Sequence, residues 1–262
     1  MTKQLASRFL LLAFSLITGP AVDAADLKLR MVWEDEPPKM KRIENAFTKD
    51  CREVDLNADR QFVDAETKGL RDAVVYVAPL PGVNLQWRQP PRNETVRIEV
   101  RDCRIHPHIS IAQTGDQLIV GKRDKSTGHS LKFSFFANPA IGPTIPVNAE
   151  SNRELTLPEP APIPVECNVH PWERGYLIVL DHTFIAVSDK KGNLVIRGLP
   201  DDTDVPLRLF HELGNIHSVV IQGERRQLER GRFNIRVSRG MKDIGEIVMD
   251  SQSFAKPKTE EH

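Results

Sequence analysis

The sequence predicts an all-β protein with two domains. Short segments alternate apolar and polar residues with period two, a few runs are continuously apolar and β-branched, and Gly and Pro residues separate these segments. The chain has 262 residues, 40% of them hydrophobic, which is enough for one large or two ordinary cores. Lys and Arg together number 36, as do Asp and Glu, so the charge favours no nucleic-acid partner.

The first 24 residues are predicted to be an export signal. Lys3 and Arg8 give a positively charged start, an apolar stretch over 9–17 follows, and small residues up to Ala24 offer a cleavage site. This stretch is too short to persist as a transmembrane helix. We therefore expect cleavage near Ala24 and a periplasmic or secreted mature protein without a transmembrane segment.

Residues 25–181 are predicted to form the first domain, which includes an N-terminal strand. The segment 39–68 is expected to be a loop with a short helix, because its periodicity is weak. Prolines between 139 and 164 predict a long connection that either wraps the surface of the domain or forms a rim around a site, and that leads into a strand ending at Cys167. The strands expected in this domain lie at 27–33, 73–78, 96–100, 109–111, 118–120 and 176–180.

Residues 182–250 are predicted to form a second, smaller β-sandwich. The turn 189–193 contains Gly192 where a positive φ is needed, which predicts a hairpin. Residues 251–262 are expected to form a polar tail. The strands expected in this domain lie at 184–187, 194–196, 207–210, 218–221, 232–237 and 244–248.

The chain has three cysteines, Cys51, Cys103 and Cys167. An odd cysteine in an oxidising compartment needs either a partner chain or a protected role. By elimination we pair Cys51 with Cys103 and leave Cys167 for a metal. A disulfide that closes a loop of this length would stabilise the fold by about 4 kcal/mol through chain entropy.

Cys167 and His170 lie three residues apart in a short turn between two strand-like runs. A thiol at the end of one strand and an imidazole on the next loop can face one metal ion, and this pair suits copper or zinc. An isolated motif of this kind is more often a buried Cys beside a surface His. A blue-copper centre also needs an earlier imidazole, which would be His129. Trp172 is expected to pack over the loop and shield the metal from water.

Residues from about 98 to 180 resemble a cupredoxin, and most of the mature chain resembles exported bacterial proteins in which a cupredoxin domain precedes a carboxypeptidase-regulatory-like β-sandwich. These proteins are often labelled methylamine-utilisation-like. The resemblance implies a Greek-key β-sandwich, an exported setting, and one copper ion held by His129, Cys167 and His170. It is carried by the segments 103–108, 115–116, 128–129, 167–172, 184–189, 192–193 and 210–212.

The sequence departs from the family's pattern at two places. Glu173 stands where the family has Met, the usual axial ligand. Residues 122–124 replace the Asn-x-Asp that usually precedes the early histidine, and Ser130 follows His129 where Asn is common. As a hard, anionic fourth ligand, Glu173 would favour Cu(II) over Cu(I). It would equally complete a tetrahedral zinc site, or face solvent and pair with Arg174.

We expect a copper-binding protein that transfers single electrons with a redox partner protein, and we do not expect an enzyme. Two alternatives stay open. One is a metal-free binding or structural module whose second domain docks to a protein or a surface polysaccharide, and the other is a zinc or metal-storage site on the same residues.

Other histidines have weaker claims to a site. His106 and His108 would face the same side of a strand, which allows a second metal-binding patch as an alternative to two ordinary histidines. His211, Glu212 and His217 belong to the predicted second domain and are expected to make ordinary loop contacts.

Overall fold

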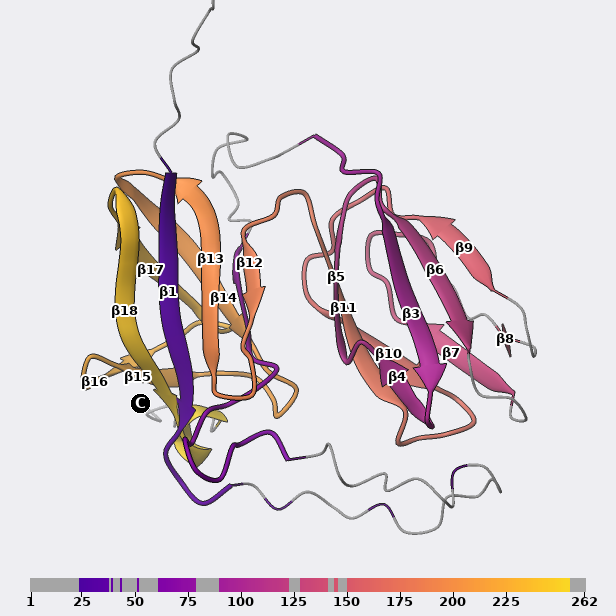
Figure 1. The fold of residues 1–262 in the computed structure, drawn as a ribbon, viewed down its shortest axis with the longest axis horizontal. Helices are drawn as coiled ribbons and strands as arrows, with labels where there is room; N and C mark the ends of the chain where they lie inside the picture. Colours follow the sequence, from indigo (N-terminus) through magenta and orange to yellow (C-terminus); the bar gives the residue numbers. More distant parts are fainter. Residues whose placement is uncertain are drawn as a thin grey trace, which may run out of the picture.

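The computed structural model describes residues 24–37, 39, 43, 51, 61–78, 90–122, 128–140, 144–145 and 150–254. Within this part of the chain the named elements are strands and one short 3-10 helix, so the predicted all-β class is confirmed. The strands form four sheets, which make up two β-sandwiches (Figure 1). The described residues include no helix with the length and apolarity needed to cross a membrane. The expected export signal lies outside them, apart from Ala24.

The first sandwich contains the candidate site. Its two sheets have the strand orders β4-β3-β6-β9 and β5-β11-β10-β7-β8. Alternate side chains of these strands point inward and form one apolar core, which includes Cys167. The strands are β3 (Thr95–Arg101), β4 (Arg104–His106), β5 (Ile109–Gln113), β6 (Gln117–Lys122), β7 (His129–Phe133), β8 (Thr144–Ile145), β9 (Ser151–Glu154), β10 (Ile163–Cys167) and β11 (Arg174–Leu180).

The second sandwich has its own, larger apolar core. Its sheets have the strand orders β13-β1-β18-β15-β16 and β12-β2-β14-β17. The strands are β1 (Ala24–Trp33), β2 (Val74–Val77), β12 (Ile185–Val187), β13 (Asn193–Pro200), β14 (Thr203–Phe210), β15 (Ser218–Ile221), β16 (Glu224–Gln227), β17 (Arg232–Val237) and β18 (Gly240–Met249).

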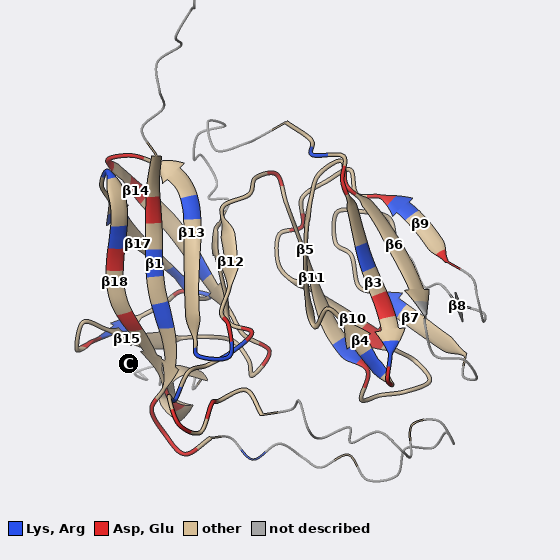
Figure 2. Ribbon diagram, viewed as in Figure 1, with Lys and Arg blue, Asp and Glu red and all other residues tan. Residues whose placement is uncertain are grey.

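The strands β1 and β2 belong to the second sandwich, which corrects the predicted boundaries of the first domain. β1 lies between β13 and β18, and β2 lies between β12 and β14. Leu27, Leu29 and Met31 are at most 1% exposed and lie in the second core. On the outer face of β1, Lys28 and Arg30 form ion pairs with acidic residues of β18 (Figure 2). The unit around the candidate site therefore begins near β3, and not at residue 25.

A third apolar cluster joins the two sandwiches. Along β11, Leu177 and Val179 enter the first core, whereas Ile178 and Leu180 face the other way and contact the cluster. Residues of β2 complete the cluster from the second sandwich, among them Tyr76. β11 is thus buried on both faces, which explains why its sequence is continuously apolar and does not alternate.

The structure corrects two local predictions. Gly192 has a φ of +84° as expected, but β12 and β13 on either side of the turn lie in different sheets, so the predicted hairpin is wrong. The turn carries the chain between the two sheets. It packs so closely on β1 that a Cβ at Gly192 would lie 2.0 Å from the carbonyl oxygen of Met31. The predicted tail also begins later, because 251–254 form the 3-10 helix η3 (Ser251–Phe254), whose Phe254 packs near Trp33.

His108 and Glu212 form an ion pair that links the two sandwiches. β4 ends at His106 and β5 begins at Ile109, so His108 lies outside both strands. The expectation that His106 and His108 share a strand is therefore wrong. Neither histidine belongs to a metal-binding group within the described residues. Burial alone would lower the pKa of His108. The hydrogen bond and charge of Glu212, together with the charge of Asp72, outweigh burial and raise this pKa.

We predict that this ion pair makes the stability of the protein depend on pH. Because the pKa of His108 is raised in the folded state, the stabilisation is fully present below the unfolded histidine pKa of about 6.5 and is lost as pH rises through the folded value. The substitution Glu212→Gln should therefore lower the free energy of unfolding more at about pH 6 than at about pH 9. Urea unfolding at both pH values measures this, with the exposed Glu224→Gln as the control. An equal loss at both pH values would contradict the assignment.

Candidate metal centre

The strand register brings the four candidate ligands to one end of a sheet in the first sandwich. His129 is the first residue of β7, Cys167 is the last residue of β10, and Glu173 directly precedes β11. β10 is antiparallel to both neighbours, so the end of β10 lies beside the starts of β7 and β11. His170 lies on the connection between β10 and β11. The sequence therefore places a thiol, a carboxylate and two imidazoles together through simple antiparallel pairing.

Backbone hydrogen bonds hold the loop that carries three of these residues. The N–H of Cys167 donates to the carbonyl of Glu173 at 3.2 Å, and the N–H of Glu173 donates to the carbonyl of His170 at 2.9 Å. The N–H of Asn168 donates to the carbonyl of Ser130 at 2.9 Å, next to His129. This last contact was missed in the sequence, where Ser130 is visible only as a departure from the family's pattern. The loop is therefore fixed to the β7 strand before any ligand binds.

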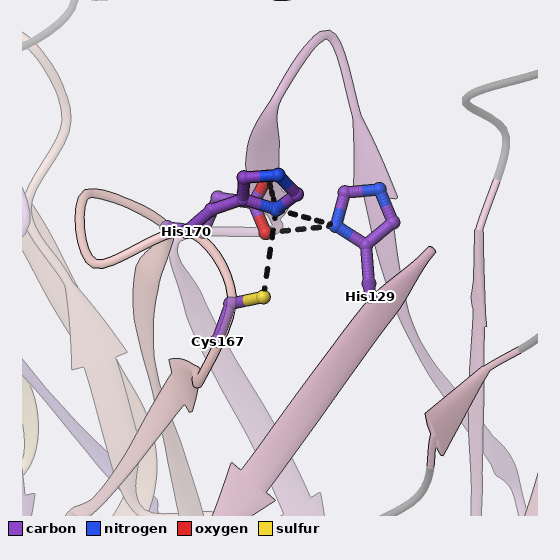
Figure 3. Close-up of side chains that lie close together, drawn as sticks. His129, Cys167 and His170 are labelled. Carbon is purple, nitrogen blue, oxygen red and sulfur yellow. Dashed lines mark hydrogen bonds and ion pairs between the residues drawn. The ribbon is translucent and has the colours of Figure 1, made fainter. Parts of the chain in front are cut away.

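The side-chain donor atoms converge on one point (Figure 3). His170 Nδ1 lies 3.7 Å from Cys167 Sγ and 3.3 Å from His129 Nδ1. Glu173 bridges the imidazoles, with one oxygen 2.9 Å from His129 Nδ1 and the other 3.2 Å from His170 Nδ1. One donor atom from each of the four residues lies within 4.8 Å of the others. All four predicted ligands are thus brought together.

Two of these separations match those expected for donors bound to a single metal ion. Tetrahedral binding at ~2.0–2.1 Å for nitrogen and ~2.3 Å for sulfur would separate two nitrogens by roughly 3.3 Å, and nitrogen from sulfur by roughly 3.6 Å. The observed separations are 3.3 Å between the two Nδ1 atoms and 3.7 Å between Cys167 Sγ and His170 Nδ1. The donor set of one thiol, two imidazoles and one carboxylate suits copper or zinc.

The site is closed to solvent. The exposed fractions are 1% for His129, 4% for Cys167, 0% for His170 and 1% for Glu173. Burying a carboxylate is costly unless a hydrogen bond or an opposite charge compensates it. Here the two Nδ1 atoms face the carboxylate, and a metal cation would neutralise both the carboxylate and the thiolate.

The inward position of Glu173 excludes one of the sequence-based alternatives. The Glu173 side chain does not reach solvent, and Arg174 pairs instead with Glu166 at 2.6 Å. The alternative in which Glu173 faces solvent and pairs with Arg174 is therefore wrong. Glu173 is the fourth member of the cluster.

Trp172 connects this cluster to the disulfide. The predicted Cys51–Cys103 bond is confirmed, and Cys167 is free and buried. The Trp172 ring lies 5.2 Å from the His170 ring, centroid to centroid, and it also packs against the disulfide. The packing of Trp172 over the loop agrees with the expectation from sequence. Its contact with the disulfide was not predicted, because nothing in the sequence spacing relates Cys51 to this loop.

We predict that Cys167 is the single free thiol and that it is protected in the folded protein. Because its exposed fraction is 4%, a thiol reagent should react slowly under native, non-reducing conditions and rapidly, with one equivalent, in denaturant. Ellman's reagent measures both rates. Cys167→Ser is the matched control and should show no free thiol in either condition. Rapid native labelling, or three thiols in the unfolded protein, would contradict the assignment.

Comparison with known proteins gives weak similarities only. No protein-family model and no curated protein matches the chain. Among solved structures, a reduced Cu(I) form of an amicyanin variant is 18% identical, with a TM-score of 0.29 over 32% of this chain and 81% of that one. A purple cupredoxin from Nitrosopumilus maritimus is 15% identical, with a TM-score of 0.27 over 32% and 97%. A copper-containing nitrite reductase from Thermus scotoductus is 14% identical, with a TM-score of 0.29 over 57% and 28%.

Proposed function

We propose that this protein binds one copper ion and serves in one-electron transfer. The observation that carries the proposal is the convergence of a buried thiol, two imidazole Nδ1 atoms and a carboxylate within 4.8 Å. Thiolate favours Cu(I), and imidazole and carboxylate accept Cu(II), so the set can hold both oxidation states. When bound, copper would supply a one-electron couple.

Four residues would each contribute one donor atom to the ion. Cys167, His129 and His170 would hold the ion, and Glu173 would act as the fourth donor. The hydrogen-bonded loop between β10 and β11 fixes these donors in advance, so little rearrangement would accompany a change of oxidation state. The anionic Glu173 would favour Cu(II) and lower the reduction potential compared with a neutral ligand.

The closed donor set favours electron transfer over catalysis, so we propose that the protein is not an enzyme. Catalytic metal sites keep a coordination position for water or substrate, whereas here four protein side chains would be available to fill the coordination sphere. Electrons would have to reach the ion through protein groups, because each of the four side chains is at most 4% exposed. A redox partner protein is the proposed source or acceptor.

The proposed location is outside the cytoplasm. The Cys51–Cys103 disulfide supports an oxidising compartment, as does the signal expected in the first 24 residues. The second sandwich is proposed to be a carboxypeptidase-regulatory-like module that docks to a protein or a surface polysaccharide. The equal numbers of cationic and anionic residues give no support for a nucleic-acid partner.

Zinc is the second candidate, and the position of Glu173 favours it. A closed tetrahedral site made of one thiolate, two imidazoles and one carboxylate would suit a structural or stored zinc ion. A metal-free module is supported less, although the contacts of Glu173 with His129 and His170 would satisfy the carboxylate without an ion.

We predict a strong thiolate-to-copper charge-transfer band in the visible spectrum after Cu(II) is added and the excess removed. The band should be absent in Cys167→Ser, because the other two cysteines form the disulfide and offer no thiolate. Equal, weak copper binding by both proteins would contradict the ligand assignment. Retention of zinc but not copper by protein from its native compartment would favour the second candidate.

The visible spectrum and the reduction potential of a Glu173 variant test whether this carboxylate binds the ion. Glu173→Gln keeps the size of the side chain and removes its charge. The charge-transfer band should persist in this variant, since Cys167 still binds, and the reduction potential should rise because Cu(II) loses an anionic ligand. An unchanged potential would show that the carboxylate does not contact the ion.

A further inference from the structure

We propose that the Cys51–Cys103 disulfide controls how tightly the metal centre retains its ion, with Trp172 transmitting the effect. This inference rests on the proposed metal-binding function and adds a redox control to it. The two half-cystines are 1% and 3% exposed, and Trp172 packs directly against them. The Trp172 ring also lies 5.2 Å from the ring of His170. One side chain therefore separates the disulfide from the cluster.

The position of Trp172 in the chain strengthens the coupling. It lies between two of the proposed ligands, two residues after His170 and one residue before Glu173. A displacement of the Trp172 backbone would move both neighbours, and a displacement of its ring would remove a packing partner of the His170 imidazole. Groups that support a ligand from outside the coordination sphere commonly change metal affinity by about 10- to 100-fold when they are lost.

The disulfide ties the first sandwich to the connection between two strands of the second. Cys103 lies in the turn between β3 and β4 of the first sandwich. Cys51 lies in the segment between β1 and β2, which are strands of the second sandwich. The bond spans 52 residues and places the half-cystines against Trp172. Breaking it would release this covalent tie.

The cavity beside Trp172 gives the ring space to move. A cavity of about 670 Å³ lies between the sandwiches, and its lining residues include Pro171 and Trp172 as well as Phe62 and Glu212. A ring packed tightly on every side would stay in place without the disulfide. Because Trp172 borders this volume, its contact with the disulfide is one of the contacts that limit its movement.

The proposed control is a two-electron thiol–disulfide exchange. A dithiol reductant breaks the S–S bond, two S–H bonds form at Cys51 and Cys103, and the dithiol is oxidised to its own disulfide. Two electrons and two protons pass to the protein. The reduced chain would then hold its ion weakly, so tight metal retention would follow disulfide formation in the oxidising compartment and would not precede it.

Release of Co(II) from the full mature chain tests the proposal. Co(II) replaces copper as the probe, because a phosphine reductant opens the disulfide without changing the oxidation state of this ion. The reductant is removed before excess chelator is added, and loss of the thiolate–Co(II) absorption gives the release rate. We expect release from the reduced protein, and from the Cys51→Ala/Cys103→Ala variant, to be about 10-fold or more faster than from the oxidised protein. Equal rates would overturn the proposal.

Two Trp172 variants test whether this residue transmits the effect. Both keep the disulfide, so this test does not depend on whether the Cys51→Ala/Cys103→Ala variant folds. Trp172→Ala should release the ion quickly even when oxidised, and reduction should add little. Trp172→Phe keeps an aromatic ring and should retain most of the sensitivity to reduction. If reduction accelerates release equally in Trp172→Ala and the parent, Trp172 does not transmit the effect. If the oxidised parent shows no thiolate–Co(II) absorption, the metal-binding function itself fails, and this outcome differs from equal release rates.

Discussion

The antiparallel register of β10 with its two neighbours is the constraint on which the candidate centre depends. Cys167 pairs with Leu131, two residues from His129, and Glu166 pairs with Arg174, the residue after Glu173. Because alternate residues share a face of a sheet, this register directs the thiol and the early imidazole to the same buried side. A shift by one residue would turn Cys167 away from His129 and separate the donors.

Packing around the sheet holds the four donor side chains in place and excludes solvent from them. β11 is buried on both faces, by the first core on one side and by the cluster shared with the second sandwich on the other. At the end of the sheet that carries the donors, Trp172 packs near His170, and the disulfide packs against Trp172. Solvent exclusion strengthens the interaction of Glu173 with the imidazoles, and it would strengthen the interaction with a bound cation in the same way.

The sequence predicted the site better than it predicted the domain organisation. Cys167, His170 and His129 were found because short spacing and residue chemistry are local, and Glu173 was found through its place in the same motif. β1 was assigned to the wrong sandwich, because alternation shows that one face of a strand is buried but does not show which sheet it joins. The turn at Gly192 was predicted because its residue pattern is also local. The sequence did not predict that the strands on either side of this turn belong to different sheets. Non-local packing, such as that of Trp172 on the disulfide, leaves no pattern in the spacing.

The central claim is that His129, Cys167, His170 and Glu173 hold one copper ion. X-ray absorption at the copper edge of the loaded protein tests this most directly, since it counts the atoms bound to the metal. The account predicts one sulfur, two imidazole nitrogens and one further light atom, and it predicts that Cys167→Ser loses the sulfur. A copper shell made only of nitrogen and oxygen in the parent protein would contradict the account.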